Sequence, residues 1–206
     1  GEDKMTKGLL REGKELSLKN MRAMAEFYAK KFKEDLKALN IQMPNGMYFA
    51  SDYIKEDANL IKKLEEKGHC FRTKSDNEVI VHLYEEEGVE CLKELRGMFA
   101  LGLWDRPRRR LLLARDRLGK KPLFYSATPA GLAFASEVAA LLQDGAIDRT
   151  PDLLAIHDYL TYQYVPPPGT GFRGVRKLPA AHYLLWEGGE PKVVPYWRLE
   201  VRPRAI

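Results

Sequence analysis

The feature that most constrains the fold is a pattern of paired strands in the second half of the chain. Residues 98–105 (MFALGLWD) favour a strand, residues 106–110 (RPRRR) favour a turn, and residues 111–115 (LLLAR) return as a second strand. Two similar pairs follow, at residues 122–136 and at residues 182–197. Antiparallel hairpins preceded and separated by helices predict an α+β fold.

Helical patterns dominate the first part of the chain. Apolar residues recur at spacings of three and four over residues 17–39, which predicts a helix of about six turns capped by Ser17. The stretch NIQMPNG at residues 40–46 interrupts it, and a second helix over residues 51–68 stops at Gly68. The two helices predict an N-terminal helical hairpin whose core is small for an independent domain.

A third helix follows a short extended segment. In SDNEVIVHLYEEEG, Ser75 is placed to cap the helix and Gly88 to end it. Shorter helical patterns follow at residues 137–142 and 151–161. Helices therefore alternate with the predicted hairpins over residues 71–206, in keeping with the α+β class.

Residue usage changes abruptly near residue 70. Residues 1–70 contain 12 Lys, 2 Arg and 1 Pro, whereas residues 71–206 contain 6 Lys, 14 Arg and 11 Pro. The net charges of the two parts are similar, +2 and +3, so electrostatic function does not explain the change. We interpret it as two coding origins joined near residue 70, with drift along one gene as the alternative, and predict domains at residues 1–70 and 71–206.

Composition excludes several classes of protein. The net charge of +5 is spread over 31% charged residues, which permits a nucleic-acid surface without indicating one. The longest apolar runs are too short to span a bilayer, and GEDKMTKG does not resemble a signal peptide. Cys70 and Cys91 have no metal-ligand spacing and favour a reducing compartment, so we expect a cytoplasmic protein.

Several motifs of the second part occur together in one known family. SDNEVIVHLYEEEG, LKELRGMFALGLWDRPRRRLLLARDRLGKKPLFY and GLAFASEVAALL resemble, in order and spacing, the glutaminase domain of glutamine-hydrolysing asparagine synthases. The resemblance covers residues 68–200 and implies a class II glutamine amidotransferase with an N-terminal-nucleophile αββα fold. It also implies that Asp76 holds the substrate glutamine. The alternative is that Asp76 only stabilises the helix start, worth about 0.3–1 kcal/mol.

The motif ARDRLGKKPLFY is the other signature of that family. Its residues describe a strand end, a charged turn in which Gly119 allows a tight bend, and Pro122 before the next strand. Arg115 and Asp116 are close enough in sequence to pair across the turn. We expect these four residues to form a structural turn, with direct ligand contact as the alternative.

The resemblance also implies a nucleophile that this sequence does not offer. The family uses a cysteine as first residue, whose own α-amino group activates the thiol. Residue 1 is Gly1, Cys70 and Cys91 are internal, and the HRGPD stretch is absent. The letters NG occur at Asn45–Gly46 with a spacing unlike that of the family's NGE loop. We therefore expect an incomplete domain without catalytic residues or glutamine hydrolysis, with open sheet edges that favour self-association.

The first part resembles a different family. The order of EDKM, EFYAKKFKEDLKALNIQMP and SDYIKEDANLIKKLEEKGHC is similar to a helical segment of cysteinyl-tRNA synthetase, over residues 2–70. Phe49 stands where that family has an arginine. Lysines are interleaved with acids, 14 basic against 12 acidic residues, so we expect at most weak, salt-dependent tRNA binding. The chain is thus predicted to be a fusion of two families.

The histidines give no metal signal by spacing. His69, His82, His157 and His182 lie far apart in sequence, and neighbouring residues such as His69 and Cys70 point to opposite sides of an extended segment. We therefore predict no metal site and no cofactor. Two further functions stay open: a degenerate amidotransferase that still binds glutamine through Asp76, and a tRNA-binding module in residues 1–70.

Overall fold

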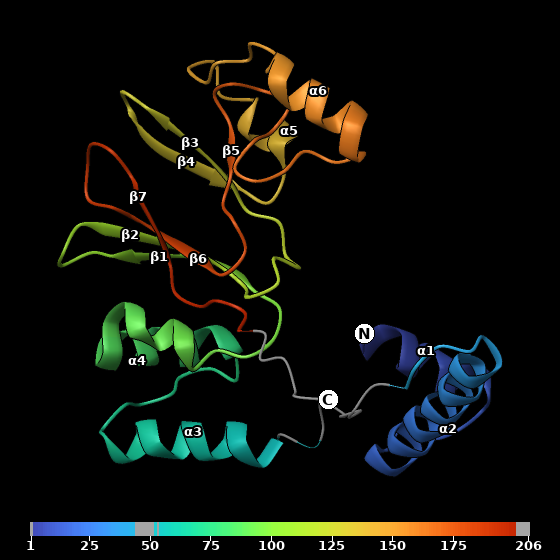
Figure 1. The fold of residues 1–206 in the computed structure, drawn as a ribbon. Coiled ribbons are helices and arrows are strands. Elements are labelled where there is room, and N and C mark those ends of the chain that lie inside the picture. Colours follow the sequence, from blue (N-terminus) through green and yellow to red (C-terminus); the bar gives the residue numbers. More distant parts are fainter. Residues whose placement is uncertain (1, 44–51, 53, 201–206) are drawn as a thin grey trace. The chain divides into compact units, whose positions relative to one another are not determined.

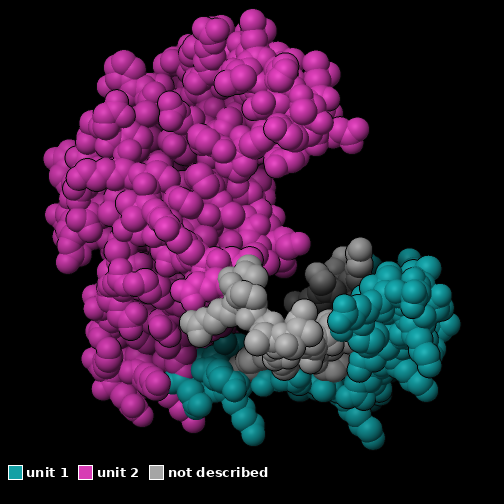
Figure 2. All heavy atoms as spheres, in the orientation of Figure 1, with its two compact units in different colours: residues 1–59 teal, residues 60–206 magenta. Residues whose placement is uncertain are grey.

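The computed structural model describes residues 2–43, 52 and 54–200. Two compact units divide the chain between residues 59 and 60 (Figure 2). The predicted boundary at residue 70 lies further along the chain, and the origin of its two parts stays a prediction. Gly1, the Asn45–Gly46 turn and Phe49 lie outside the described residues.

The first unit is built on two helices, α1 (Glu2–Arg11) and α2 (Leu18–Ala38) (Figure 1). The predicted cap of α2 is confirmed, since Ser17 Oγ accepts a hydrogen bond from the Asn20 amide at 3.2 Å. Leu9 of α1 and Met24 of α2 are buried. Other apolar side chains that the periodicity placed inward are exposed: Leu18, Tyr28, Phe32 and Leu39. The sequence did not predict α1, which covers only one stripe of α2.

Helix α3 (Ile54–Glu66) crosses from one unit into the next. Its later turns lie in the second unit, where Leu64 is 3% exposed and Leu60 packs against the same core. The predicted stop is confirmed: the helix ends before Gly68, whose φ of 96° suits glycine. Residues 60–66 of α3 thus belong to the second unit, whereas the sequence analysis placed the whole helix in an N-terminal hairpin over residues 1–70.

Helix α4 (Asp76–Glu87) begins and ends where the sequence predicts. Ser75 Oγ accepts from the Asn77 amide at 3.2 Å, and Gly88 follows the last turn with a φ of 59°. A 3₁₀ helix, η2 (Gly88–Lys93), continues the chain and buries Cys91 and Leu92. Together α4 and η2 present a continuous apolar surface to the sheet beside them.

The three predicted hairpins are confirmed, and they belong to two antiparallel sheets. The first has the order β1-β2-β6-β7, and the second has the order β4-β3-β5. In the first sheet, Leu112 pairs with Leu103 on one side and with Leu185 on the other. The strands are β1 (Ala100–Asp105), β2 (Arg110–Arg115), β3 (Phe124–Thr128), β4 (Gly131–Ala135), β5 (Arg176–Lys177), β6 (His182–Trp186) and β7 (Lys192–Pro195).

Alternation of side chains along the strands creates four layers in the second unit (Figure 1). Leu112 of β2 joins a core with α3, α4 and η2, whereas Leu113 joins a core between the two sheets. On the second sheet, Tyr125 faces the first sheet and Phe124 faces a third core with α5 (Val138–Leu141). The order helix, sheet, sheet, helix confirms the predicted α+β class with antiparallel strands.

Helix α6 (Leu153–Tyr162) is the least covered helix of the second unit. Asp152 caps it by accepting from the amides of Leu154 and Ala155. Ala155 is buried, while Leu154 and Leu160 are among its exposed apolar side chains. Over the described ranges, no helix has both the length and the apolar content needed to cross a bilayer.

Candidate functional site

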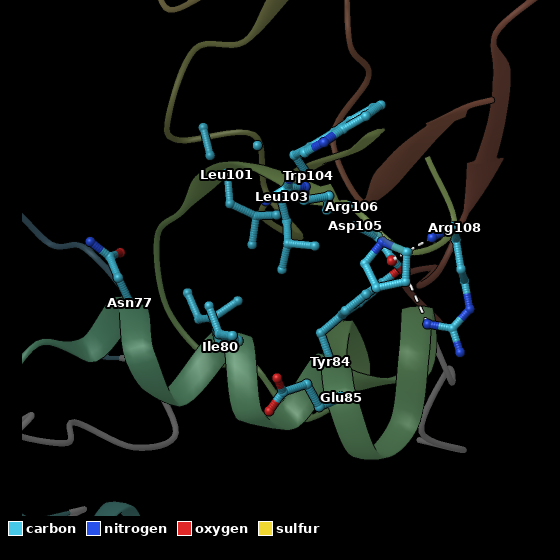
Figure 3. Close-up of a pocket in the computed structure, with 14 residues that line it drawn as sticks. Asn77, Ile80, Tyr84, Glu85, Leu101, Leu103, Trp104, Asp105, Arg106 and Arg108 are labelled. Carbon is cyan, nitrogen blue, oxygen red and sulfur yellow. Dashed lines mark hydrogen bonds and ion pairs between the residues drawn. The ribbon is translucent and has the colours of Figure 1, made fainter. Parts of the chain in front are cut away.

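A groove of about 690 Å³ runs between α4 and the edge strand β1 (Figure 3). Among the described strands β1 pairs only with β2, and its free edge borders the groove. Helix positions separated by three and four residues supply one wall, which includes Asn77, Ile80 and Tyr84. Leu101 and Leu103 supply apolar surface on the opposite side. The groove therefore combines an apolar middle with polar groups at both ends.

One end of the groove is fixed by the buried carboxylate of Asp105. Its Oδ2 atom accepts from the Tyr84 hydroxyl at 3.0 Å and from the Arg108 guanidinium at 2.9 Å, and Oδ1 accepts from the Arg108 amide. The hydrogen bonds from Arg108 lower the pKa of Asp105. Burial, with the hydrogen bond to Asp105, raises the pKa of Tyr84. The turn RPRRR thus places Arg108 at this end of the groove.

The other end of the groove lies at the start of α4, where Asp76 is found. Asp76 is the first residue of the helix and is exposed, with its Oδ1 atom 3.5 Å from Ser75 Oγ. The next residue, Asn77, lines the groove, whereas Asp76 does not. The predicted substrate residue is therefore placed beside the mouth of the groove, in reach of solvent.

Glu78 organises the segment that leads into α4, a role that sequence reasoning missed. Its carboxylate accepts from the backbone amides of Arg72 at 2.6 Å and Thr73 at 2.7 Å, and from the Thr73 hydroxyl. The Thr73 hydroxyl and then the Arg72 amide lower the pKa of Glu78 to about 2. The pattern Ser75-x-x-Glu78 is typical of a capping box and was the available signal. Here the glutamate binds the amides of Arg72 and Thr73, which precede the cap residue Ser75 by three and two positions.

Arg115 donates hydrogen bonds to three backbone carbonyls. Its guanidinium donates to the carbonyl oxygens of Lys121, Leu178 and Gly119, each at 2.7 Å. Its own carbonyl accepts from the Tyr196 hydroxyl at 2.9 Å. These contacts join the end of β2, the following loop and the segment before β6. The planar fork of arginine can hold several carbonyls at once.

Asp116 accepts hydrogen bonds from backbone amides of the same loop. Its side chain, 1% exposed, accepts from the amides of Leu118, Lys120 and Lys121 at 3.2, 2.9 and 2.9 Å. Burial acts to raise the pKa of Asp116, but the backbone amides outweigh it and the pKa is lowered. The predicted ion pair with Arg115 is not formed in the described part of the chain, because each side chain is engaged by the loop backbone.

Gly119 and Pro122 lie on the same loop. Gly119 has a φ of 63°, and a Cβ atom there would lie 3.0 Å from Ala180 Cβ and 3.1 Å from Arg115 Cζ. Both the backbone angle and the space therefore favour glycine. Pro122 is exposed and directly precedes the buried Leu123, at the entry to β3.

The two cysteines differ in accessibility. Cys91 is 1% exposed in the first core, and burial raises the pKa of its thiol to about 11. Cys70 is exposed. A thiolate is the reactive form of cysteine, so Cys91 is poorly suited to act as a nucleophile near neutral pH.

Among the described residues, one group has ligand atoms placed for a metal ion: His69, His82 and Glu85. The sequence predicted no such site, because His69 lies outside α4 and no local spacing connects it with the two helix residues. The folded chain brings the group together on the side of α4 where Glu85 borders the groove.

With the layers and the groove established, comparison with known proteins assigns the family. Residues 46–197 match the family described as "Glutamine amidotransferase domain". The chain belongs to this family. The match starts upstream of residue 68, where the predicted resemblance began, and it includes all of α3.

Named relatives agree with this family. Asparagine synthetase 3 (glutamine-hydrolysing) of Bacillus subtilis strain 168 is 36% identical over 155 residues, covering 75% of this chain and 25% of the relative. A putative glutamine-hydrolysing asparagine synthetase of Mycobacterium tuberculosis H37Rv is 45% identical over 114 residues, covering 54% of this chain and 18% of the relative. The chain thus spans a quarter or less of the length of these relatives.

One solved structure overlaps part of this chain. Glutamine phosphoribosylpyrophosphate amidotransferase from B. subtilis, complexed with ADP and GMP, is 19% identical and has a TM-score of 0.46. The overlap covers 69% of this chain and 27% of that one. The fold class of this chain therefore follows from its own sheets and cores, described above.

Proposed function

We propose that residues 60–197 form a glutamine-binding domain of the kind that serves glutamine-hydrolysing asparagine synthetases. The family match and the names of the relatives support this assignment. The groove of about 690 Å³ is within the usual size range of small-molecule sites and is large enough for an amino acid. In a longer protein of this kind, the domain would act in asparagine formation.

Asp76 is the proposed contact for the α-ammonium group of glutamine. It is an exposed carboxylate at the start of α4, beside the groove residue Asn77. Glu78 stabilises the segment before the helix by accepting hydrogen bonds from two of its backbone amides. A carboxylate on a rigid helix end can orient a charged ligand at the mouth of an apolar groove.

We further propose that this 206-residue chain does not hydrolyse glutamine by itself. The observation that carries this proposal is the chemistry of the two cysteines. Both Cys70 and Cys91 have their nitrogen in a peptide bond, so neither has an adjacent α-amine that could act as the base. Cys91 is in addition buried and protonated at neutral pH.

Calorimetry with L-glutamine tests the binding role of Asp76. Loss of one charge-assisted contact costs about 1.5–3 kcal/mol, so Asp76→Ala is expected to weaken binding about tenfold or more. Asp57→Ala is a matched control, since Asp57 is an exposed acid in the first turn of α3. Equal affinity of the wild type and Asp76→Ala would contradict the assignment.

Ammonia release from glutamine tests the catalytic proposal separately. The wild type is expected to release ammonia no faster than the buffer alone. The variant Cys70→Ala is the useful comparison, because Cys70 is the accessible thiol. Turnover by the wild type that disappears in Cys70→Ala would show that an internal cysteine acts as nucleophile.

The fusion with a cysteinyl-tRNA synthetase segment stays a proposal. Its support is the change from lysine to arginine usage near residue 70 and the order of motifs in residues 2–70. Sequencing the transcript across this position tests it, and separate reading frames on either side would oppose it. Self-association and weak tRNA binding also stay predictions, to be checked by light scattering and by gel shift at two salt concentrations.

A further inference from the structure

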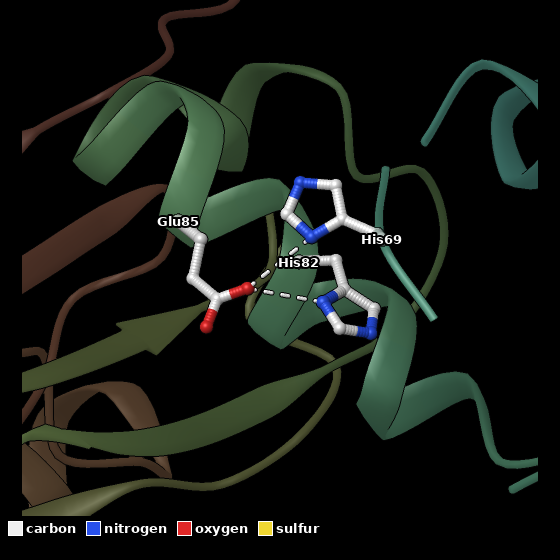
Figure 4. A group of neighbouring side chains, drawn as sticks. All are labelled: His69, His82 and Glu85. Atoms are coloured by element: carbon white, nitrogen blue, oxygen red, sulfur yellow. Dashed lines mark hydrogen bonds and ion pairs between the residues drawn. The ribbon is translucent and has the colours of Figure 1, made fainter. Parts of the chain in front are cut away.

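His69, His82 and Glu85 converge on one point beside α4 (Figure 4). His82 and Glu85 lie three residues apart on the same side of the helix, and His69 approaches from the extended segment after α3. Glu85 Oε2 is 3.0 Å from His82 Nδ1 and 3.4 Å from His69 Nδ1. The imidazole centroids are 4.6 Å apart. Three potential ligand atoms thus share a small volume.

The outward ring nitrogens also face carboxylates. His69 Nε2 is 3.0 Å from Glu86 Oε1, and His82 Nε2 is 3.7 Å from Glu78 Oε1. The His82 Nε2 atom is buried without a hydrogen-bond partner in the described structure. Carboxylates behind metal-binding histidines are a common arrangement, because they fix the tautomer and make the inner nitrogen a better ligand.

With both Nδ1 atoms unprotonated, the centre of the cluster suits a cation. When each imidazole presents its Nε2–H to an outer carboxylate, both Nδ1 lone pairs point toward the Glu85 oxygen. Three electron-rich atoms then face one another, which is unfavourable unless a proton or a metal ion lies between them. Lys67 is paired with Glu86 at 2.6 Å, so its charge is engaged on the outer side of the cluster.

We propose that His69, His82 and Glu85 bind a zinc ion, with water as the fourth ligand. Tetrahedral zinc with bonds of about 2.0–2.2 Å places its ligand atoms about 3.4 Å apart, close to the two distances to Glu85 Oε2. The three ligand atoms lie within 4.8 Å of one another, so small side-chain rotations complete the geometry. Two imidazoles with one carboxylate form a donor set that suits zinc.

The surroundings fit such a site. The two histidine side chains are 14% exposed, whereas Glu85 is 55% exposed and leaves a path for the ion. Phe71 packs against the His82 ring edge to face, with centroids 4.8 Å apart, and supplies an apolar wall. The bound ion would tie the segment after α3 to α4 and so fix the helix that carries Asp76. This inference does not depend on glutamine binding.

Zinc titration of the metal-stripped 206-residue chain, competed against a chromophoric chelator, tests the site. We expect one zinc ion per chain and a rise in Tm on addition of zinc sulfate. Glu85→Gln, at an exposed position, should weaken zinc binding more than about 100-fold without unfolding the chain. Glu86→Gln removes an outer carboxylate and should weaken it about 10- to 100-fold.

His157→Asn is the matched control, since His157 is 76% exposed on α6 and lies 3.8 Å from an Asp158 carboxylate oxygen. It should bind zinc within about twofold of the wild type. His69→Asn and His82→Asn should each abolish the Tm increase, with circular dichroism used to check their folding. The proposal is overturned if the wild type takes up no zinc at micromolar concentration, or if Glu85→Gln binds zinc as tightly as the wild type.

Discussion

Removing the Asp116 carboxylate is the most direct perturbation of the loop that follows β2. Asp116→Ala leaves three backbone amides without their acceptor. Hydrogen bonds to a charged group are worth about 1.5–3 kcal/mol each, which sets an upper bound of about 4.5–9 kcal/mol. The amides are only partly buried, so water replaces part of the loss and we expect a destabilisation of about 3–5 kcal/mol. Asp116→Asn keeps one acceptor oxygen and should cost less.

Urea unfolding followed by tryptophan fluorescence measures this cost. All three tryptophans, Trp104, Trp186 and Trp197, lie in the second unit, so the signal reports on the part that contains the loop. The control is Asp144→Ala, because exposed Asp144 accepts from one backbone amide, that of Ala146 at 2.9 Å. It should cost about 0.5–1.5 kcal/mol. If Asp116→Ala costs no more than Asp144→Ala, the three amide bonds do not hold the loop.

Four further perturbations test other parts of the structure. Because Glu78 has a folded pKa of about 2, its contribution to stability is present above its unfolded pKa and is lost as the pH falls toward 2; Glu78→Gln should flatten acid unfolding over this range. Leu64→Ala should destabilise the second unit by about 2–5 kcal/mol in urea unfolding. Gly119→Ala should cost about 1–3 kcal/mol by the same assay, through its positive φ and contact with Ala180. Iodoacetamide should label Cys70 and spare Cys91 in mass spectra of the native chain.

The hairpins and α4 could be predicted because their signals are local. Turn residues, strand-forming residues and the Ser75 cap each act over a few positions, and the structure has these elements within a few residues of the predicted bounds. The packing of the two sheets required long-range contacts: Leu113 of β2 and Leu184 of β6 belong to the first sheet and share a core with Tyr125 of the second. Periodicity predicts which side of an element faces inward, but it does not identify a partner that covers that side.

The missed features depend on groups that meet only after folding. His69 and His82 belong to separate elements, so ligand spacing in the sequence could not bring them together. Arg115 and Asp116 are neighbours with opposite charges, so the sequence favoured an ion pair between them. In the structure they instead form hydrogen bonds to carbonyls and amides of the loop backbone, because buried backbone groups need a hydrogen-bond partner. A buried backbone group without a partner costs more than an exposed ion pair provides.

Helix α3 has the lysine-rich composition of the first part of the chain but packs in the core of the second unit. Lysine-rich composition places residues 54–66 with the first part of the chain, but Leu60 and Leu64 pack in the core with Leu83 and Tyr84. The family match also includes this helix. A helix with apolar residues at the right spacing can cover the outer face of a sheet whatever its surface charges, because its buried face alone decides the packing. The amidotransferase core therefore extends back at least to Leu60, within the lysine-rich part of the chain.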